Sequence, residues 1–480
     1  MTMNASFALQ RFGLGARFDL SASDRTAMDQ DPRAALKAEL VPEVAKLDSP
    51  DLPSSAEALV AVMEQQKAKK AMREEIAAAA KPDIAAANQP MATAPQPTPS
   101  QPTDPSVQKM NVQRDIFLDE AQAHFNKAFT DKTGLIERLV WFWSNHFAVS
   151  VTKGQQVRAT AGSFEREAIR PHVLGRFVDM LMAVEQHPTM LFYLDNRDSF
   201  GPDSKAGQRR QKGLNENLAR EIMELHTLGV NGGYAQADVT SLARVITGWT
   251  FPNLSNDRAE PGKFIFNPNA HEPGAFKLLG KTYAAAGQAQ GEAALHDLAF
   301  HPATARHLAF KFARHFVADE PPPNLVDKLT SNFLTKGGDL KAFTETLLTA
   351  DESWDGAAKK LRQPQTYLIA ASRALNLSPD RPQPLLGALK ALGQPLWEPS
   401  GPNGFGDTQA DWASPEGIKM RLGYASLMAS QSHVAGNPSE ILAQLYGDAP
   451  SPETKQAVAR AESRQQGLAL LLMSPEFQRC

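Results

Sequence analysis

The chain has 480 residues, of which 42% are hydrophobic and 21% charged, and its formal net charge is -3. This balance is ordinary for a globular protein and lacks the strongly basic character by which proteins bind nucleic acids, so we expect no DNA or RNA partner. The only cysteine is Cys480, which excludes an intrachain disulfide, a cysteine-rich zinc site and an iron–sulfur cluster.

The sequence predicts an N-terminal helical segment over residues 1–81, where alanine-rich and charge-rich windows have the apolar spacing of helices. This segment does not begin with the basic region, apolar run and cleavage site of a signal peptide, and no apolar stretch is long enough to span a bilayer. As written, the chain is therefore expected to be cytoplasmic. Residues 82–108 are rich in Ala, Pro, Thr, Gln and Ser, which indicates a linker before a main helical domain over 109–480.

The main domain opens with two strongly apolar helical patterns, at 112–131 and 135–149. Further helices are expected at about 161–184, 214–229, 238–247, 288–298, 302–317, 323–334, 339–349, 363–376, 383–391, 414–429, 438–446 and 452–473. Strand signals are sparse, although FKLLGKTY, preceded by FIFNPNAHEPG, has the composition of one small hairpin. The predicted fold is mainly α: a large irregular multi-helix bundle with at most one small β-hairpin.

A histidine lies in the middle of the apolar face of the helix predicted over 135–147. Leu139 and Phe142 share that face with His146, so we expect the imidazole to be buried. A buried imidazole is most often structural, bonded to a carbonyl or a carboxylate. The functional alternative is that His146 meets Glu221 or Glu224 across the core as an acid and base pair.

Polar groups are unusually dense in the helix predicted over 214–229. At about 100° per residue, Asn217, Arg220, Glu221 and Glu224 lie on one side of an apolar stripe, and His226 lies on its opposite edge. The simplest interpretation is an Arg220–Glu224 ion pair, with Glu221 bonded to a neighbouring helix. The alternative is a site at the edge of the core.

Downstream residues could complete such a site. Arg244 could reach back to a carboxylate of this helix, Trp249 follows it, and His271 with Glu272 forms a pair in a loop that we expect to be exposed. The candidate catalytic residues are Glu221, Glu224 and His146; the candidate substrate-binding residues are Asn217, Arg220, Arg244, His226, His271 and Trp249.

Two further groups of residues are less specific. His301, His307 and His315 do not share one helix face and are interpreted mainly as structural. The loop at 393–417 combines glycines and prolines with Trp397, Phe405 and Trp412. Such aromatic side chains either stack on a sugar ring or plug a core.

The sequence contains no strong motif for a cofactor, and its residues do not specify a metal. The Glu-x-x-His spacing of carboxylate-bridged metal bundles is absent, so a metal site would need ligands from several helices. The letters HTLG at 226–229 resemble the stretch around the proximal haem ligand of plant-type peroxidases. Four letters recur by chance and the distal pattern of those enzymes is absent, which argues against haem.

Several long phrases resemble, in order, the bacterial family called domain of unknown function 1800 (DUF1800). They are RFGLGAR, WSNHF, HPTMLFYLDN, NENLAREIMELHTLGVNGGY, DVTSLARVITGW, HPATARHLAFKFARHFVADEPP and GQPLWEP. Relatives are often encoded beside proteins like sulfatases and alkaline phosphatases, and many are exported, so the resemblance implies such a partner and allows export. This chain departs by lacking an evident signal peptide and by having Gly404-Phe405 where relatives tend to have Gly-Trp.

Three functions follow as hypotheses. The first is a hydrolase or lyase whose Glu, His and Arg residues act on a polar small molecule or a glycan. The second is a non-catalytic partner or scaffold of a sulfatase-like or alkaline-phosphatase-like protein, in which the polar helix only fixes packing. The third is a metalloprotein with His and carboxylate ligands.

Overall fold

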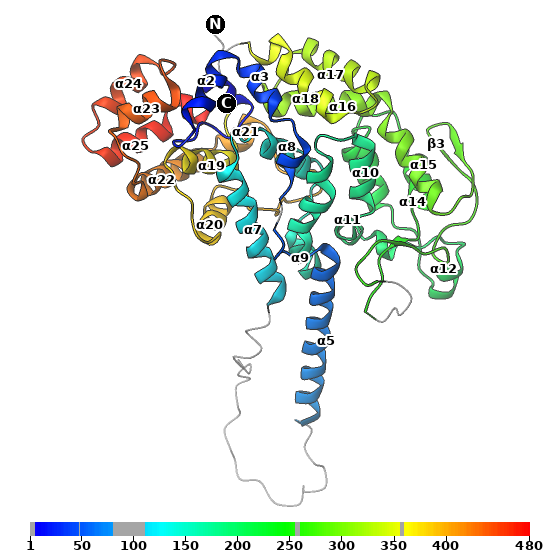
Figure 1. The fold of residues 1–480 in the computed structure, drawn as a ribbon. Helices are drawn as coiled ribbons and strands as arrows, with labels where there is room; N and C mark the ends of the chain where they lie inside the picture. Colours follow the sequence, from blue (N-terminus) through cyan, green and yellow to red (C-terminus); the bar gives the residue numbers. More distant parts are fainter. Residues whose placement is uncertain (1–4, 48, 80–110, 255–259, 356–359) are drawn as a thin grey trace, which may run out of the picture.

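The computed structural model describes residues 5–47, 49–79, 111–254, 260–355 and 360–480. The predicted linker at 82–108 lies outside these residues. The N-terminal part is helical, as predicted, and consists of α1 (Ala5–Arg11), α2 (Ala22–Gln30), α3 (Pro32–Ala38), α4 (Pro42–Ala45) and α5 (Ser55–Ala79). Helix α5 packs against α7 and α9 at its start and then projects from the body (Figure 1).

The middle of the molecule is a group of apolar helices: α7 (Val112–Thr130), α8 (Leu135–His146), α9 (Gln155–Phe164), α10 (Phe177–Glu185) and α11 (Pro188–Tyr193). The single helix expected over 161–184 is interrupted. A π-helical turn, η3 (Glu165–Ile169), follows α9 directly, and a 3₁₀ turn separates it from α10. Pro171 in that turn cannot donate a backbone hydrogen bond, which accounts for the break.

Small strands lie in the next part of the chain. It contains α12 (Lys205–Arg210), α13 (Asn217–Glu221), α14 (Gln236–Val245), β1 (Trp249–Thr250), β2 (Ile265–Phe266), β3 (Phe276–Leu278), β4 (Lys281–Tyr283) and α15 (Gln288–Ala299). The predicted hairpin forms within FKLLGKTY, where Leu279 and Gly280 turn at positive φ between β3 and β4. The preceding FIF segment does not join it, because β2 pairs antiparallel with β1 as a second two-stranded sheet.

The remaining helices are α16 (Pro302–Phe316), α17 (Pro323–Thr335), α18 (Leu340–Thr349), α19 (Pro364–Ala374), α20 (Gln383–Ala391), α21 (Gln409–Trp412), α22 (Pro415–Gln431), α23 (Pro438–Tyr446), α24 (Pro452–Ala459), α25 (Arg464–Met473) and α26 (Pro475–Gln478). Many begin with proline in the first turn, where no backbone donor is lost. Ser414, Asn437 and Ser451 also accept a backbone hydrogen bond at the starts of α22, α23 and α24. These signals explain why the helix starts were readable from sequence.

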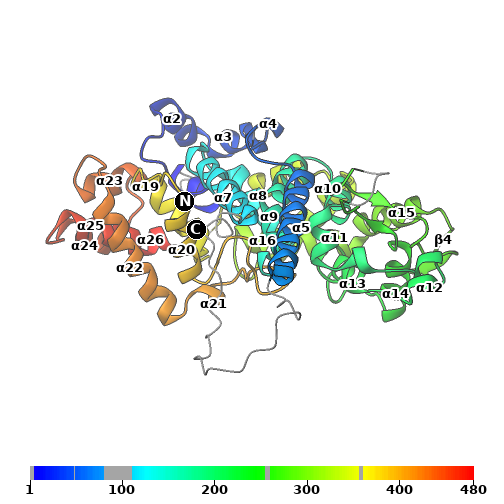
Figure 2. The same ribbon diagram turned by 90° about the horizontal axis from the view of Figure 1, so that it is seen from below.

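One continuous hydrophobic core runs through the molecule and includes Phe12, Leu36, Trp143, Phe312 and Leu468. Helices α23 to α25 lie at one end, α12, α14 and α15 at the other, and α8, α9 and α16 between them (Figures 1 and 2). The mainly α fold is therefore confirmed.

The N-terminal residues are bound to distant parts of the chain. Arg11 donates from Nη1 to the carbonyl oxygen of Ser353 over 2.9 Å, and Gln444 donates from Nε2 to that of Phe18, also over 2.9 Å.

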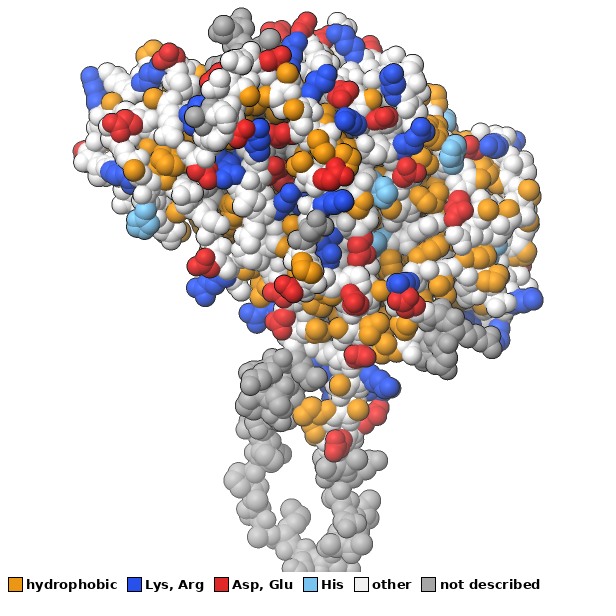
Figure 3. Space-filling model, in the orientation of Figure 1, with side chains coloured by type: hydrophobic (Ala, Val, Ile, Leu, Met, Phe, Trp, Pro, Cys, Tyr) orange, Lys and Arg blue, Asp and Glu red, His pale blue; other side chains and the backbone are white. Residues whose placement is uncertain are grey.

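Acidic and basic side chains are interspersed over the face in Figure 3, without a large field of one sign. This distribution agrees with the near-neutral composition. Within the described ranges, no helix combines the length and apolar character needed to cross a bilayer.

Candidate functional site

The predicted polar helix changes its winding in the middle. Residues 217–221 form α13, and the chain then continues as a π-helical turn, η6 (Ile222–His226). In a π-helix, the backbone bonds residue i to i+5, so each turn is wider than in an α-helix. The 3.6-residue period that places His226 opposite Glu221 therefore does not apply.

The acidic side chains of this helix differ in their surroundings. Arg220 pairs with Glu224 at 3.5 Å and with Glu216 at 3.2 Å, so the predicted Arg220–Glu224 ion pair is present. Asn217 is exposed. Glu221 is half-buried and forms no side-chain hydrogen bond with another described residue; its burial raises its pKa, although His226 opposes the shift.

His226 belongs to a buried pair that sequence reasoning missed. Its Nδ1 donates to Oε1 of Glu185, at the end of α10, over 2.7 Å, and both side chains are fully buried. Glu185 was detectable in principle, because it continues the apolar stripe of Leu181 and Val184 and a carboxylate there requires a partner.

His146 is buried, as predicted, but it does not pair with Glu221 or Glu224. Its Nε2 lies 3.1 Å from the carbonyl oxygen of His226, and its Nδ1 accepts from Nζ of Lys311 over 3.0 Å. The carbonyl can only accept, so Nε2 carries the proton. The first interpretation, a structural imidazole bonded to a carbonyl, therefore holds, because the ring satisfies the carbonyl at the end of η6. The alternative acid and base pair with Glu221 or Glu224 does not form.

His307 has a similar role on the other side of η6. Its Nε2 donates to the carbonyl oxygen of Leu225 over 3.2 Å. Burial lowers the pKa of His307 to about 4 and that of His146 well below its usual value, so both are neutral donors at pH 7. Two imidazoles from α8 and α16 thus hold the last carbonyls of the π-turn.

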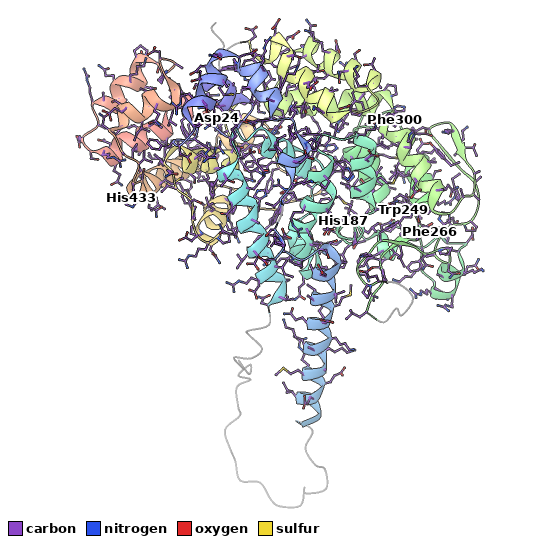
Figure 4. All side chains as sticks on the ribbon, viewed as in Figure 1. Asp24, His187, Trp249, Phe266, Phe300 and His433 are labelled. Atoms are coloured by element: carbon purple, nitrogen blue, oxygen red, sulfur yellow. The ribbon has the colours of Figure 1, made fainter. Side chains whose placement is uncertain are left out.

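The downstream candidates do not converge on these acids. The Arg244 guanidinium lies over the Phe276 ring, 5.5 Å from its centroid, and makes no ion pair with another described residue, contrary to the prediction. Trp249 is fully buried in β1, opposite Phe266 in β2 (Figure 4).

The loop pair predicted to be exposed is also not free. His271 is half-buried and bonded through Nδ1 to the Thr247 carbonyl oxygen at 2.9 Å. Glu272 is buried and accepts from the Asp203 backbone nitrogen over 2.9 Å. The expectation of an exposed pair was wrong because this loop folds back onto the segment after α14.

A cavity of about 60 Å³ lies elsewhere, among α7, α8, α9, α16 and the loop after α20. None of Glu221, Glu224 or His146 lines it. Its wall combines aromatic, amide and ionisable side chains. They include Trp141, Phe164, Trp397 and Phe405; Asn145, Gln363, Gln365 and Gln394; and His124, Arg138, Glu165 and His315. This mixture of apolar surface and a few polar groups is typical of small-molecule sites.

Glu165 is the acidic group of this wall and the first residue of η3. It accepts from Nδ1 of His124 over 3.1 Å, from Nη2 of Arg170 over 2.9 Å and from Nε1 of Trp397 over 3.3 Å. Arg170 also binds both carboxylate oxygens of Glu137, at 2.7 and 2.8 Å. Burial alone would raise the pKa of Glu165, but His124 and Arg170 outweigh it and lower the pKa to about 2. Glu165 is therefore a permanent anion at neutral pH.

A second histidine and carboxylate pair contributes to the same cavity. Nδ1 of His315 donates to Oδ2 of Asp407 over 3.1 Å, while its Nε2 is buried without a hydrogen-bond partner in the described part of the chain. Asp407 is fixed in turn by Nε2 of Gln363 at 2.8 Å and by Nζ of Lys360 at 3.4 Å. Burial lowers the pKa of His315 although Asp407 opposes the shift, so the imidazole is neutral at pH 7 and keeps a lone pair on Nε2.

Asn145 attaches the aromatic loop to α8. Its Nδ2 donates to the Phe405 carbonyl oxygen over 3.0 Å, and its Oδ1 accepts from the Phe405 nitrogen over 2.7 Å. Gly404 adopts a φ of +75°, and a Cβ there would lie 2.4 Å from the Asn145 carbonyl oxygen. The loop can therefore approach α8 only with glycine at this position. The WSNHF helix and the loop after GQPLWEP meet at the cavity.

Across the described part of the chain, no group of three or more His, Cys, Asp or Glu side chains is placed to hold a metal ion. The chain matches the family described as protein of unknown function (DUF1800) over residues 7–479. Searches of curated proteins and of solved structures find no match. The chain, with the WSNHF helix and the GQPLWEP loop at its cavity, therefore belongs to the DUF1800 family.

Proposed function

We propose that the protein is an enzyme, a hydrolase or lyase, in which His315 is the general base of the cavity. The observation that carries this proposal is the His315–Asp407 pair. One ring nitrogen is held by a carboxylate, the other is buried without a hydrogen-bond partner among the described residues, and His315 lines the cavity. Such an arrangement orients an imidazole to take a proton from water or from a substrate carbon.

The pair of His124 and Glu165 gives the cavity a fixed negative charge, on the Glu165 carboxylate. Glu165 stays ionised, so it cannot donate a proton, but its charge favours positive charge that develops in a bound transition state. A pair of carboxylates acting as acid and base on a glycan is not supported here, because Glu165 is the only carboxylate that the described residues contribute to the wall.

The size and lining of the cavity restrict the substrate. Since one ordered water needs about 10–15 Å³, a space of about 60 Å³ admits a group of roughly four to six water-sized atoms. Four amide side chains provide donors and acceptors, and Trp141 and Trp397 provide flat apolar surface. We therefore propose a small polar molecule, or the terminal group of a larger one such as a glycan, as substrate.

Replacing His315 tests the assignment. In a screen of 4-nitrophenyl esters and glycosides, the wild-type protein is expected to turn over at least one compound, and His315→Asn to lower kcat by about 10²–10⁴-fold with little change in Tm. The activity of the wild type should fall as the pH drops, with a midpoint below the ordinary histidine value of 6.5. Asp407→Asn should move this midpoint further down, because the carboxylate favours the protonated ring.

His296→Asn is the matched control. His296 is 61% exposed, and Asp297, at 3.9 Å, is the only charged side chain among the described residues that it contacts. Its replacement should leave kcat unchanged. Full activity in His315→Asn, with the same compound and an unchanged fold, would refute the assignment of the general base.

A second candidate is a non-catalytic partner of a sulfatase-like or alkaline-phosphatase-like protein. It is favoured by α5, most of whose side chains are exposed from Gln66 onward where the helix projects from the body (Figure 1). Copurification of such a protein with the wild type, and its loss when Arg73 and Ile76 are replaced with Glu, would support this role. Retention of the partner by that variant would exclude α5 as its binding surface.

A further inference from the structure

Lys311 is a half-buried amine without a carboxylate partner. It lies on α16, four residues after His307 and four before His315, so the three side chains follow one face of the helix. Its Nζ donates to Nδ1 of His146 over 3.0 Å, and it forms no ion pair with another described residue. Buried lysines are nearly always paired, so this exception requires an explanation.

The surroundings of the amine are mostly neutral. His146 comes from α8, His307 from α16 itself, and His226 from η6, and the low pKa values of His146 and His307 keep these two rings uncharged at pH 7. Asp407 is the facing anion, but it is bonded to His315 and interacts with Lys311 only at longer range. Burial lowers the pKa of Lys311 to about 8, with Asp407 opposing the shift.

The chemistry of this environment suits a nucleophile. A lysine amine attacks carbon only when it is unprotonated, and desolvation next to neutral or cationic groups is how proteins keep it so. Nδ1 of His146 accepts a hydrogen bond from Nζ of Lys311. The same ring nitrogen is placed to remove a proton from the attacking amine.

We propose that Lys311 is a covalent site that forms an imine with a small aldehyde or ketone. The Nζ lone pair adds to the carbonyl carbon, and Nδ1 of His146 carries one proton from the nitrogen to the oxygen, which gives a carbinolamine. The same ring nitrogen then carries the second proton of the amine to the hydroxyl, and the C–O bond breaks, so that water leaves as the C=N bond forms. The products are one imine and one water molecule, and no oxidant or reductant is consumed. This activity is separate from the role of His315 and does not depend on it.

Reductive trapping tests the proposal directly. The wild-type protein is incubated with acetaldehyde and cyanoborohydride at pH 7, and the ethylated lysines are located by peptide mass spectrometry. A pKa of about 8 instead of 10.5 gives Lys311 about 300-fold more neutral amine at this pH. Part of that advantage is lost to partial burial, so we expect Lys311 to react at least about tenfold faster than the exposed Lys277. Its rate should level off above pH 8, whereas that of Lys277 continues to rise.

Two variants complete the experiment. Lys311→Arg should lose the fast-labelling site, and Lys277→Arg should keep it. Labelling of Lys311 no faster than that of Lys277 overturns the proposal, and so does a rate that still rises with pH as steeply as that of Lys277. Because the readout is a covalent adduct, its failure leaves the His315 turnover assay unaffected, and failure of that assay leaves the adduct measurable.

Discussion

Arg170→Met is expected to lower the free energy of unfolding by about 3–5 kcal/mol. The guanidinium of Arg170 is 1% exposed and binds Glu137 and Glu165, which are 0% and 2% exposed. Methionine fills a similar volume but leaves two buried carboxylates without their cation. Breaking a buried ion pair from one side is costly because the remaining charge cannot be solvated.

Urea unfolding followed by circular dichroism measures this loss. Arg306→Met is the matched control, since Arg306 pairs with Asp327 at the surface, where the side chains are 65% and 62% exposed. We expect a change below about 1 kcal/mol for that variant. If the free energy of unfolding falls by less than about 1 kcal/mol in both variants, the Glu137–Arg170–Glu165 network does not stabilise the fold as a buried ion pair.

Glu39→Gln is expected to stabilise the protein at pH 8 by about 3 kcal/mol and to have little effect at pH 4. Glu39 is buried at the end of α3, where its Oε2 accepts from Oγ1 of Thr133 over 2.5 Å. Burial raises its pKa from 4.5 to about 7. The folded-state pKa thus lies above the unfolded value, so the contribution of Glu39 is greatest below pH 4.5 and is lost as the pH rises through 7.

The magnitude follows from the shift of about 2.5 pKa units, each of which corresponds to about 1.4 kcal/mol. Glutamine keeps an oxygen that accepts from Thr133 and carries no charge, so it avoids the loss of stability that ionisation of the buried Glu39 causes at high pH. Chemical denaturation of both proteins at pH 4, 6 and 8 gives the pH dependence, with the exposed Glu43→Gln as control. If Glu39→Gln stabilised the protein equally at all three pH values, ionisation of Glu39 would not be the cause of the stabilisation.

The helices that sequence predicted best are those with explicit start signals. The pattern at 302–317 corresponds to α16 (Pro302–Phe316), and that at 323–334 to α17 (Pro323–Thr335). Both begin with proline in the first turn. The expected helix at 452–473 is two helices, α24 and α25, separated by a turn before Ser463. Apolar periodicity continues across such a turn and does not reveal it.

The candidate site was less accessible to sequence reasoning. The π-turn at 222–226 changes the rotation per residue, so a 3.6-residue period does not describe the direction of the His226 side chain. The alternative contact of His146 with Glu221 or Glu224 does not form, because its Nε2 bonds the carbonyl of His226. His315 was interpreted as structural because the three histidines of its segment do not share one helix face. Its partner, Asp407, lies 92 residues later in an irregular loop. His124 and Glu165 are likewise 41 residues apart. Only tertiary packing brings such pairs together, and a single sequence carries no periodic signal for them.

The contacts of the first helix with the last third of the chain have a kinetic consequence. Arg11 binds the carbonyl of Ser353, and Gln444 binds that of Phe18, at sequence separations of 342 and 426 residues. During synthesis, residues 5–18 therefore emerge from the ribosome long before either partner exists, and these two contacts form only after most of the chain has been made. Contacts of this range also close large loops late, so refolding from denaturant should be slow compared with helical proteins of local topology.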